Sequence, residues 1–190
     1  MSEKLHGQHA FITGGGSGIG LACARAFAAD GARVSIMGRS QEKLAGALEE
    51  LRALGQAEAY PADVSSEAEV QAAVDAANAQ APLTIAVANA GIGGLAPLAV
   101  TEDADWQRIL QTNLTGTFYT FKHAGKAIAL AGGGAMSAIS SIAGVRTHRF
   151  MHAYCVSKAG VDMLVRNSAD ELGVSGVRVN SVCPCLLYTS

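Results

Sequence analysis

The sequence has little charge, and neither sign dominates. Its 190 residues include 14 lysines and arginines against 16 aspartates and glutamates, which gives a formal net charge of −2. A surface built mainly to bind nucleic acid needs a clear basic excess, so we expect no nucleic-acid partner. Charged residues make up only 16% of the chain, but 49% of it is hydrophobic, which is far too apolar for a disordered protein. We therefore expect one globular domain.

The sequence also lacks an uninterrupted apolar run long enough to cross a membrane. Two stretches, 83–101 and 127–145, contain no charged residue. The first contains Asn89, Pro97 and several glycines, and the second contains three consecutive glycines and three serines. Lipid would leave the backbone of such segments without hydrogen-bond partners, so we interpret both as buried strands followed by loops. The N-terminal residues do not resemble an export signal, and we expect a cytoplasmic protein with no membrane partner.

Cysteines are few and mostly far apart. They stand at positions 23, 155, 183 and 185. Cys183 and Cys185 are close in sequence, but no second ligand pair lies at a spacing that zinc could use. We therefore expect reduced thiols and no metal site.

What the sequence does have is a regular alternation of short apolar runs and segments with helical periodicity. Strands are predicted at 9–13, 33–37, 57–60, 84–88, 135–140 and 177–182. Ser40 can cap one of the intervening helices, residues 66–69 have the pattern of a capping box, and a long helical segment is expected from Trp106 past Phe121. Strands that alternate with helices form parallel sheets with helices on both faces. The predicted fold is therefore α/β, and no low-complexity linker divides it.

A glycine-rich turn follows the first predicted strand. Residues 13–20 read Thr-Gly-Gly-Gly-Ser-Gly-Ile-Gly and lead into a predicted helix. Glycines let a pyrophosphate approach the backbone, and the first N–H groups of the helix offer that anion a positive dipole end. The glycines at 14, 18 and 20 do not have the G-x-G-x-x-G spacing. The position of the turn, at the start of a strand–helix–strand unit, nevertheless favours a dinucleotide phosphate site over an ordinary turn.

No carboxylate ends the second predicted strand. When the cofactor is NAD, an acid usually stands there and accepts a hydrogen bond from the adenosine ribose. Here the strand ends with Met37-Gly38-Arg39-Ser40. An arginine suits a 2′-phosphate, which a carboxylate would repel, so NADP(H) is favoured over NAD(H). A solvated Arg39 that binds no ligand is the alternative.

A tyrosine and a lysine lie four residues apart in a predicted helix. This spacing places Tyr154 and Lys158 on one helix face, about 6 Å apart along the axis. Tyrosine in water ionises only near pH 10, and a nearby ammonium group favours the phenolate. Such pairs are common on protein surfaces. Here, however, Ser140 and Ser141 end the strand that leads to this helix, which favours a proton-transfer site.

Together these motifs resemble the short-chain dehydrogenase/reductase family, in its smaller single-domain branch. The motifs are residues 13–20, Asp63-Val64, Asn89-Ala90-Gly91, Asn113, Ser141, Tyr154 with Lys158, and Arg178-Val179-Asn180-Ser181. They occur in the family's order over nearly the whole chain. The resemblance implies a Rossmann-type doubly wound parallel sheet with strand order 3-2-1-4-5-6 and the seventh strand missing. It also implies hydride transfer between NAD(P)(H) and a carbonyl or alcohol.

The resemblance further implies roles for individual residues. Tyr154 would be the general acid/base, and Ser141, rather than Ser140, would polarise the substrate carbonyl because it stands at the family's spacing of thirteen residues before the tyrosine. Lys158 would favour the phenolate and bind the nicotinamide ribose, and Asn113 would hold a proton-relay water. Cofactor contacts are implied for Gly14, Ser17, Gly18, Ile19, Gly20, Arg39, Asp63, Val64, Asn89, Gly91, Tyr154 and Lys158.

Three departures from the family pattern are visible. Ala88 stands where the family usually has an asparagine, and Ser137 where a branched apolar residue is more usual. After Pro184 the family continues with a glycine and a segment that covers the substrate, whereas this sequence ends Cys-Leu-Leu-Tyr-Thr-Ser. We therefore expect residues 1–184 to form the NAD(P)-binding domain and residues 185–190 to be a non-native or truncated tail. A truncated chain would lack one wall of the substrate pocket, so weak or no turnover is expected.

Two interpretations of the function stay open. The first is an NADP(H)-dependent oxidoreductase of a small carbonyl or alcohol, assembled as a homo-oligomer (dimer or tetramer) through the helices that carry Phe118, Phe121 and Val165. The second is a non-catalytic or inactive truncated nucleotide-binding module, which the missing C-terminal portion favours. A methyltransferase on a similar sheet would need an acid after the second strand and would leave Tyr154 and Lys158 unexplained.

Overall fold

Six parallel strands form one sheet in the computed structural model, which describes residues 4–185. The strands are β1 (His9–Thr13), β2 (Arg33–Gly38), β3 (Ala57–Pro61), β4 (Ile85–Ala88), β5 (Gly134–Ile139) and β6 (Val177–Val182). Their order across the sheet is β3-β2-β1-β4-β5-β6, and every neighbouring pair is parallel. The predicted fold class and strand order are confirmed.

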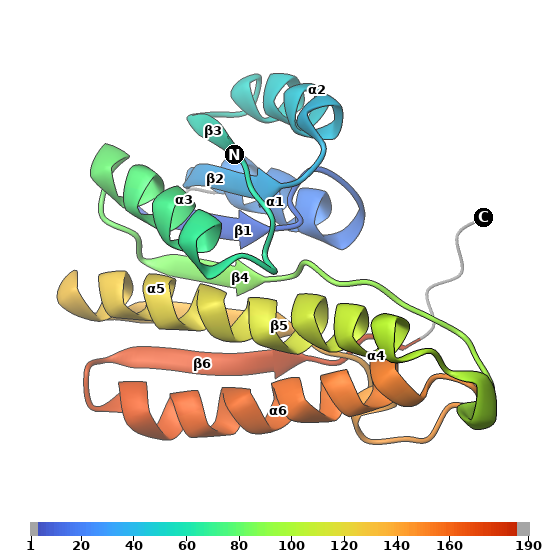
Figure 1. Cartoon of the computed structure of the whole chain (residues 1–190). Helices are drawn as coiled ribbons and strands as arrows, with labels where there is room; N and C mark the ends of the chain where they lie inside the picture. The colour runs from blue at the N-terminus through green and yellow to red at the C-terminus, as the bar shows by residue number, and fades with distance from the viewer. Residues whose placement is uncertain (1–3, 186–190) are drawn as a thin grey trace.

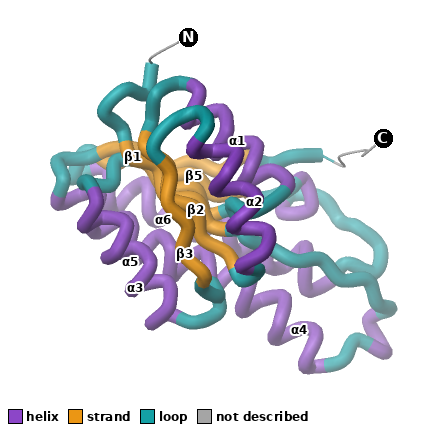
Figure 2. Tube along the Cα trace, turned by 90° about the horizontal axis from the view of Figure 1, so that it is seen from above, coloured by secondary structure: helices purple, strands orange, loops and turns teal. Residues whose placement is uncertain are grey.

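Helices cover both faces of this sheet. They are α1 (Gly18–Ala29), α2 (Gln41–Arg52), α3 (Glu67–Gln80), α4 (Asp103–Leu110), α5 (Gly116–Leu130) and α6 (His152–Gly173). Figures 1 and 2 show α3, α5 and α6 on one face, and α1 and α2 on the other. Two short 3₁₀ turns, η1 (Leu98–Val100) and η3 (Ile142–Gly144), lie in the loops after β4 and β5.

The core consists of two layers separated by the sheet. Successive residues of a strand point to opposite faces, so Phe11 of β1 packs toward α3, α5 and α6 while Ile12 packs toward α1 and α2. Both side chains are fully buried, and burial of a side chain of this size contributes roughly 1.5–3 kcal/mol. The strands therefore appear in the sequence as continuous apolar runs rather than as alternating patterns.

Two serines begin helices as expected, but the capping box is only half formed. Ser40 Oγ accepts a hydrogen bond from the Lys43 N–H at 3.3 Å, and Ser66 Oγ accepts one from the Glu69 N–H at 3.4 Å. The Glu69 carboxylate does not return to Ser66. It accepts from the Asp63 N–H at 2.8 Å, because the Ser66 N–H already donates to the Asp63 carbonyl in a tight turn.

The long helix expected from Trp106 past Phe121 is interrupted. Between α4 and α5 the chain forms a π-helical turn, η2 (Gln111–Thr115), in which the helix widens by one residue. The turn directs Asn113 into the interior, where it is completely buried. Wide turns of this kind frequently occur at functional sites, and this one lies beside the loop that follows β4.

Three further findings bear on predictions made from the sequence. None of the described helices combines the length and apolarity that a membrane span requires. Within residues 4–185, no group of three or more His, Cys, Asp or Glu side chains is arranged to hold a metal ion, and the four cysteines are free thiols. The predicted tail at 185–190 lies, apart from Cys185, outside the described residues.

Candidate active site

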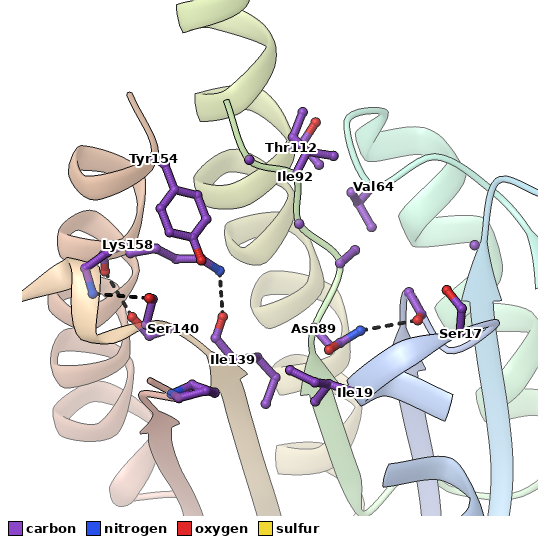
Figure 3. Close-up of a pocket in the computed structure, with 18 of the residues that line it drawn as sticks. Ser17, Ile19, Val64, Asn89, Ile92, Thr112, Ile139, Ser140, Tyr154 and Lys158 are labelled. Atoms are coloured by element: carbon purple, nitrogen blue, oxygen red, sulfur yellow. Dashed lines mark hydrogen bonds between the residues drawn. The ribbon is translucent and has the colours of Figure 1, made fainter. Parts of the chain in front are cut away.

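A cavity of about 820 Å³ opens at the carboxyl ends of the strands. Its wall comes from the glycine turn after β1, from the segment after β2, from residues 89–93 after β4, from residues 139–143 at the end of β5, and from α6. The strand order reverses between β1 and β4, and ligands of open parallel sheets bind outside the carboxyl ends of the strands at such a point. Figure 3 shows this cavity in close-up, with residues of its wall drawn as sticks.

The glycine turn is built so that the backbone forms the cavity floor. Gly14 has φ +66°, a left-handed conformation that favours glycine, and a Cβ there would lie 2.8 Å from Asn89 Nδ2. A Cβ on Gly20 would collide with the Gly14 carbonyl. Asn89 fixes the turn by donating to the carbonyls of Thr13 (2.9 Å) and Gly14 (3.2 Å). A dashed line in Figure 3 marks one hydrogen bond of Asn89.

The N-terminus of α1 is open toward this floor. Ser17 is the N-cap residue, but its hydroxyl makes no capping hydrogen bond. The first N–H groups of a helix have no partner inside the helix, and they carry the positive end of its dipole. The sequence predicted a phosphate site here, and these groups have the chemistry that such a site requires.

Tyr154 and Lys158 enter the cavity together from α6. Figure 3 shows both side chains directed toward the end of β5. Lys158 Nζ lies 5.6 Å from the centroid of the Tyr154 ring and donates a 2.7 Å hydrogen bond to the Ile139 carbonyl. Only 5% of Lys158 is exposed, and this burial lowers its pKa to about 8, while the Asp162 carboxylate acts in the opposite direction. The ammonium is therefore mostly protonated at neutral pH.

The two serines at the end of β5 are used differently. Ser140 is buried, and its hydroxyl donates to the Lys158 carbonyl at 3.3 Å. Ser141 is half-buried in the cavity wall, where its Oγ accepts from the Ala143 N–H at 3.1 Å. Because that bond uses only a lone pair of Ser141, its hydroxyl hydrogen can be donated to a ligand.

Asn113 lies behind the cavity wall rather than in it. Its Oδ1 accepts from the Ile92 N–H at 2.8 Å, and its Nδ2 donates to the Ile92 carbonyl at 2.9 Å and to Ser157 Oγ at 3.0 Å. Both amide hydrogens are thus used. In this structure the side chain joins the loop after β4 to α6.

Arg39 and Asp63, which the sequence assigned to separate cofactor contacts, face each other. Arg39 Nη1 lies 3.9 Å from Asp63 Oδ2, and 68% of the arginine side chain is exposed. An exposed ion pair of this length contributes little to stability. Arg39 therefore stays available at the cavity edge, beside Lys43 from the first turn of α2.

Most of the predicted site residues line one cavity. The wall contains Gly14, Ser17, Ile19, Arg39, Val64, Asn89, Gly91, Ser141, Tyr154 and Lys158. The remaining four adjoin residues of the wall: Gly18, Gly20, Asp63 and Asn113. Ser141 and Tyr154, which stand thirteen residues apart in the sequence, thus line the same cavity.

Sequence reasoning did not identify Ser157. Its hydroxyl donates to the Tyr154 carbonyl at 2.7 Å and accepts from Asn113 Nδ2, and the residue is completely buried. A signal was present, since Ser157 lies four residues before the buried Val161 on the same helix face. Lys43 was also missed, although it stands in the first turn of the helix that follows Arg39.

Comparison with known proteins gives consistent results. Residues 8–190 match the short chain dehydrogenase family. The galactitol 2-dehydrogenase (L-tagatose-forming) of Cereibacter sphaeroides is 39% identical over 188 residues, which cover 98% of this chain and 74% of that enzyme. The D-threitol dehydrogenase of Mycolicibacterium smegmatis is 38% identical over 190 residues, which cover 98% of this chain and 72% of that enzyme.

Solved structures agree with the fold. A short-chain type dehydrogenase/reductase from Mycobacterium ulcerans superposes with a TM-score of 0.95 at 42% identity, covering 100% of this chain and 70% of that one. Carveol dehydrogenase from Mycobacterium avium, solved in complex with NAD, gives a TM-score of 0.94 at 30% identity, covering 96% of this chain and 72% of that one. The chain therefore belongs to the short-chain dehydrogenase/reductase family of oxidoreductases.

Proposed function

We propose that this protein transfers a hydride between NADP(H) and a small carbonyl or alcohol substrate, with Tyr154 as the general acid/base. The observation that supports this most strongly is the convergence of Tyr154, Lys158 and Ser141 on the cavity whose floor is the glycine turn. Each of these groups has the chemistry that the reaction needs: a proton donor, a fixed positive charge, and a hydroxyl that can polarise a carbonyl.

The described residues fit a nicotinamide dinucleotide. The backbone floor and the open start of α1 suit a pyrophosphate. At the other end of the cavity, a Cβ on Gly91 would lie 3.3 Å from Asn113 Oδ1 and 3.6 Å from Lys158 Nζ, so the absence of a side chain there keeps the passage beside the lysine clear. When bound, the nicotinamide would supply or accept the hydride. The NAD named with the carveol dehydrogenase structure supports a cofactor of this class.

The proposed preference for NADP(H) depends on Arg39 and Lys43. Both residues line the cavity after β2, and Ser40 between them caps α2. Two cations at this position favour a 2′-phosphate, and no carboxylate follows β2 directly to repel it. Asp63 is the acid nearest to Arg39, and its 3.9 Å separation leaves the guanidinium free to turn toward a phosphate.

The proton steps follow from the chemistry of the side chains. For reduction, the Tyr154 hydroxyl gives its proton to the substrate oxygen while Ser141 donates a second hydrogen bond to that oxygen. By analogy with other donors to a developing oxyanion, Ser141 contributes about 3 kcal/mol. The positive charge of Lys158 stabilises the phenolate left behind. An ammonium has three hydrogens, and only one is held by Ile139, so two remain for the ribose and for water.

The substrate side of the cavity is moderately apolar. Ile92, Ile142 and Met151 line it together with one polar side chain, His148. The names of the relatives, galactitol 2-dehydrogenase and D-threitol dehydrogenase, support an alcohol or carbonyl substrate.

We also propose a homo-oligomer that forms through the outer faces of α5 and α6. Phe118 is 44% exposed, and Met163 is 53% exposed. Phe121 and Val165, which the sequence placed on the same helices, are instead buried in the core and are not available to a partner. The contact would therefore be made by Phe118 and Met163. We propose a cytoplasmic location, as predicted from the sequence.

The proposal is tested by comparing the unaltered chain with Tyr154→Phe. NADPH binding is followed by cofactor fluorescence, and turnover by NADPH oxidation with a panel of ketones. We expect equal binding and a loss of turnover of about 100-fold or more, because the variant lacks the transferable proton. An unaltered chain that binds NADPH but reduces none of the ketones would support the alternative of a nucleotide-binding module instead.

A further inference from the structure

A carboxylate is buried directly behind the proposed active site. Asp162 lies one helical turn after Lys158 on α6, and only 8% of it is exposed. Its Oδ2 has no hydrogen-bond partner among the described residues. Buried carboxylates are almost always paired, because removal of the charge from water is costly. Some other interaction must therefore offset the cost of burying this carboxylate.

The surroundings of Asp162 belong to the site. A Cβ on Gly144 would lie 2.5 Å from Oδ2, so the glycine leaves the space that the carboxylate occupies. Gly144 ends the η3 turn that Ser141 begins. On the other side, the Cys183 thiol donates to Oδ1 at 3.8 Å. Asp162 is thus held between α6, the turn that carries Ser141, and the segment after β6.

Lys158 lies one turn before Asp162 on the same face of α6. Residues four apart on a helix have Cβ atoms about 5–6 Å apart. The attraction of Asp162 raises the pKa of Lys158, opposing the larger effect of burial. The Lys158 ammonium meets no carboxylate among its hydrogen-bond partners, since its hydrogen bond goes to the Ile139 carbonyl.

The other elements packed around Lys158 offer little negative charge. The end of β5 and η3 supply the hydroxyls of Ser140 and Ser141, and the π-turn supplies the neutral amide of Asn113. His148 in the cavity wall can only add positive charge. Two groups besides Asp162 can become anionic: Tyr154, which reacts, and the Cys183 thiol, whose negative form also raises the pKa of Lys158.

We propose that Asp162 is a positioning residue of this active site, the buried carboxylate that keeps Lys158 charged beside Tyr154. This inference rests on the proposed function, in which the positive charge of Lys158 stabilises the Tyr154 phenolate. A carboxylate that served only to join helix and turn would use its oxygens in hydrogen bonds, whereas Oδ2 is left without one. No hydrogen-bond donor in the described part of the chain therefore balances the charge of Asp162 at Oδ2.

The test is the titration of Lys158 in the Asp162→Asn variant, which keeps the shape of the side chain and removes its charge. The protonation state is read from the ¹³Cε chemical shift of Lys158 in the substrate-free chain. In the unaltered chain we expect a midpoint at about pH 8. In the variant the midpoint should fall by about one pH unit or more, because burial is then no longer opposed. The pH above which ketone reduction declines should fall by the same amount.

Asp170→Asn is the matched control, because it removes the same charge from an exposed position on α6. The control should leave the Lys158 midpoint unchanged. A midpoint that is the same in Asp162→Asn and Asp170→Asn would overturn the proposal. So would a Cys183→Ser variant that lowers the midpoint as far as Asp162→Asn does, because the thiol would then be the effective anion.

Two further measurements test the role of Asp162 if Asp162→Asn does not fold. The first is the Lys158 midpoint of Asp162→Ala, which replaces Asp162→Asn. The second is the midpoint of the unaltered chain, where a value below pH 7 would contradict the proposal. The chemical shift is read without substrate, so a chain that reduces no ketone refutes the proposed function but still reports the titration. A chain that turns over normally with an unmoved midpoint refutes only the role of Asp162.

Discussion

The Lys158 ammonium donates a 2.7 Å hydrogen bond to the carbonyl oxygen of Ile139, the last residue of β5. Ser140, the next residue of the chain, donates in turn to the carbonyl of Lys158 at 3.3 Å. Strand and helix are thus joined at both the side chain and the backbone of one residue. The position of the charge beside Tyr154 is therefore set by the sheet as well as by α6.

Replacement of Lys158 by methionine should abolish most of the activity without preventing folding. Methionine fills a similar volume but supplies no charge, so proton transfer through Tyr154 loses its support. We expect kcat at pH 7 to fall by about 100-fold or more. The measurement is NADPH-dependent ketone reduction, with Lys126→Met as the control because Lys126 is exposed on α5. Equal activity of the two variants would contradict the assigned role.

Arg39→Ala should weaken the use of NADPH and leave the use of NADH nearly unchanged. The guanidinium would contact the 2′-phosphate, which NADH lacks, so we expect kcat/KM for NADPH to fall by about tenfold or more, as for a lost charge-assisted contact. Parallel assays with the two cofactors measure the ratio. Arg52→Ala, whose side chain pairs with Glu58 at the far end of α2, is the control. A ratio that does not move would mean that Arg39 binds no phosphate.

Ser157→Ala should destabilise the protein and weaken the link between α6 and the loop after β4. The substitution leaves the Asn113 amide, which is completely buried, short of one partner, and an unsatisfied buried polar group costs about 1–3 kcal/mol. Urea unfolding measures the loss, and Ser175→Ala, at an exposed position after α6, serves as the control. A free energy of unfolding equal to that of the control would show that the hydrogen bond between Asn113 and Ser157 does not stabilise the protein.

Stability should decrease in mild acid because of His9. The ring is buried, with Nδ1 donating to the Ala81 carbonyl at 2.9 Å and Nε2 accepting from the Ser35 hydroxyl at 2.8 Å. Burial lowers the pKa of His9 below its ordinary value of 6.5, with a smaller effect in the same direction from the charge of Arg33 and an opposing one from the bond to Ala81. The unfolded chain therefore takes up a proton first as the pH falls.

The contribution of His9 to stability is accordingly complete above about pH 6.5 and is lost as the pH falls through its lowered value in the folded state. Urea unfolding at pH 7.5 and pH 5.5 measures the loss, and His9→Gln, which does not titrate, isolates it from other groups. We expect the unaltered chain to lose more stability between these two pH values than His9→Gln does. Equal losses would exclude His9 as the source.

The strands could be predicted closely because both faces of a parallel sheet are covered. Runs such as Ala10-Phe11-Ile12 are apolar at every position, and the observed bounds of each strand lie within one residue of the prediction. Ten of the residues that line the cavity were found from the glycine turn, from the four-residue spacing of Tyr154 and Lys158, and from the family resemblance.

What escaped prediction depends on contacts between distant parts of the chain. Nothing near Asn113 in the sequence shows that the backbone of Ile92, 21 residues away, holds its side chain. The ion pair of Arg39 with Asp63 likewise arises only when the segments after β2 and β3 meet. The capping-box pattern failed for a related reason, because the Glu69 carboxylate found a better-placed donor in the preceding loop.

The π-helical turn at 111–115 changes which side of the helix faces the core, because it rotates α5 relative to α4. An α-helix advances by about 100° per residue, so one extra residue rotates everything after it by that angle relative to everything before it. Deletion of one residue from this turn would restore a straight helix, but it would carry either Ile109 or Phe121 off its packing surface. The surplus residue is thus what allows two incompatible apolar stripes to serve one continuous helical segment.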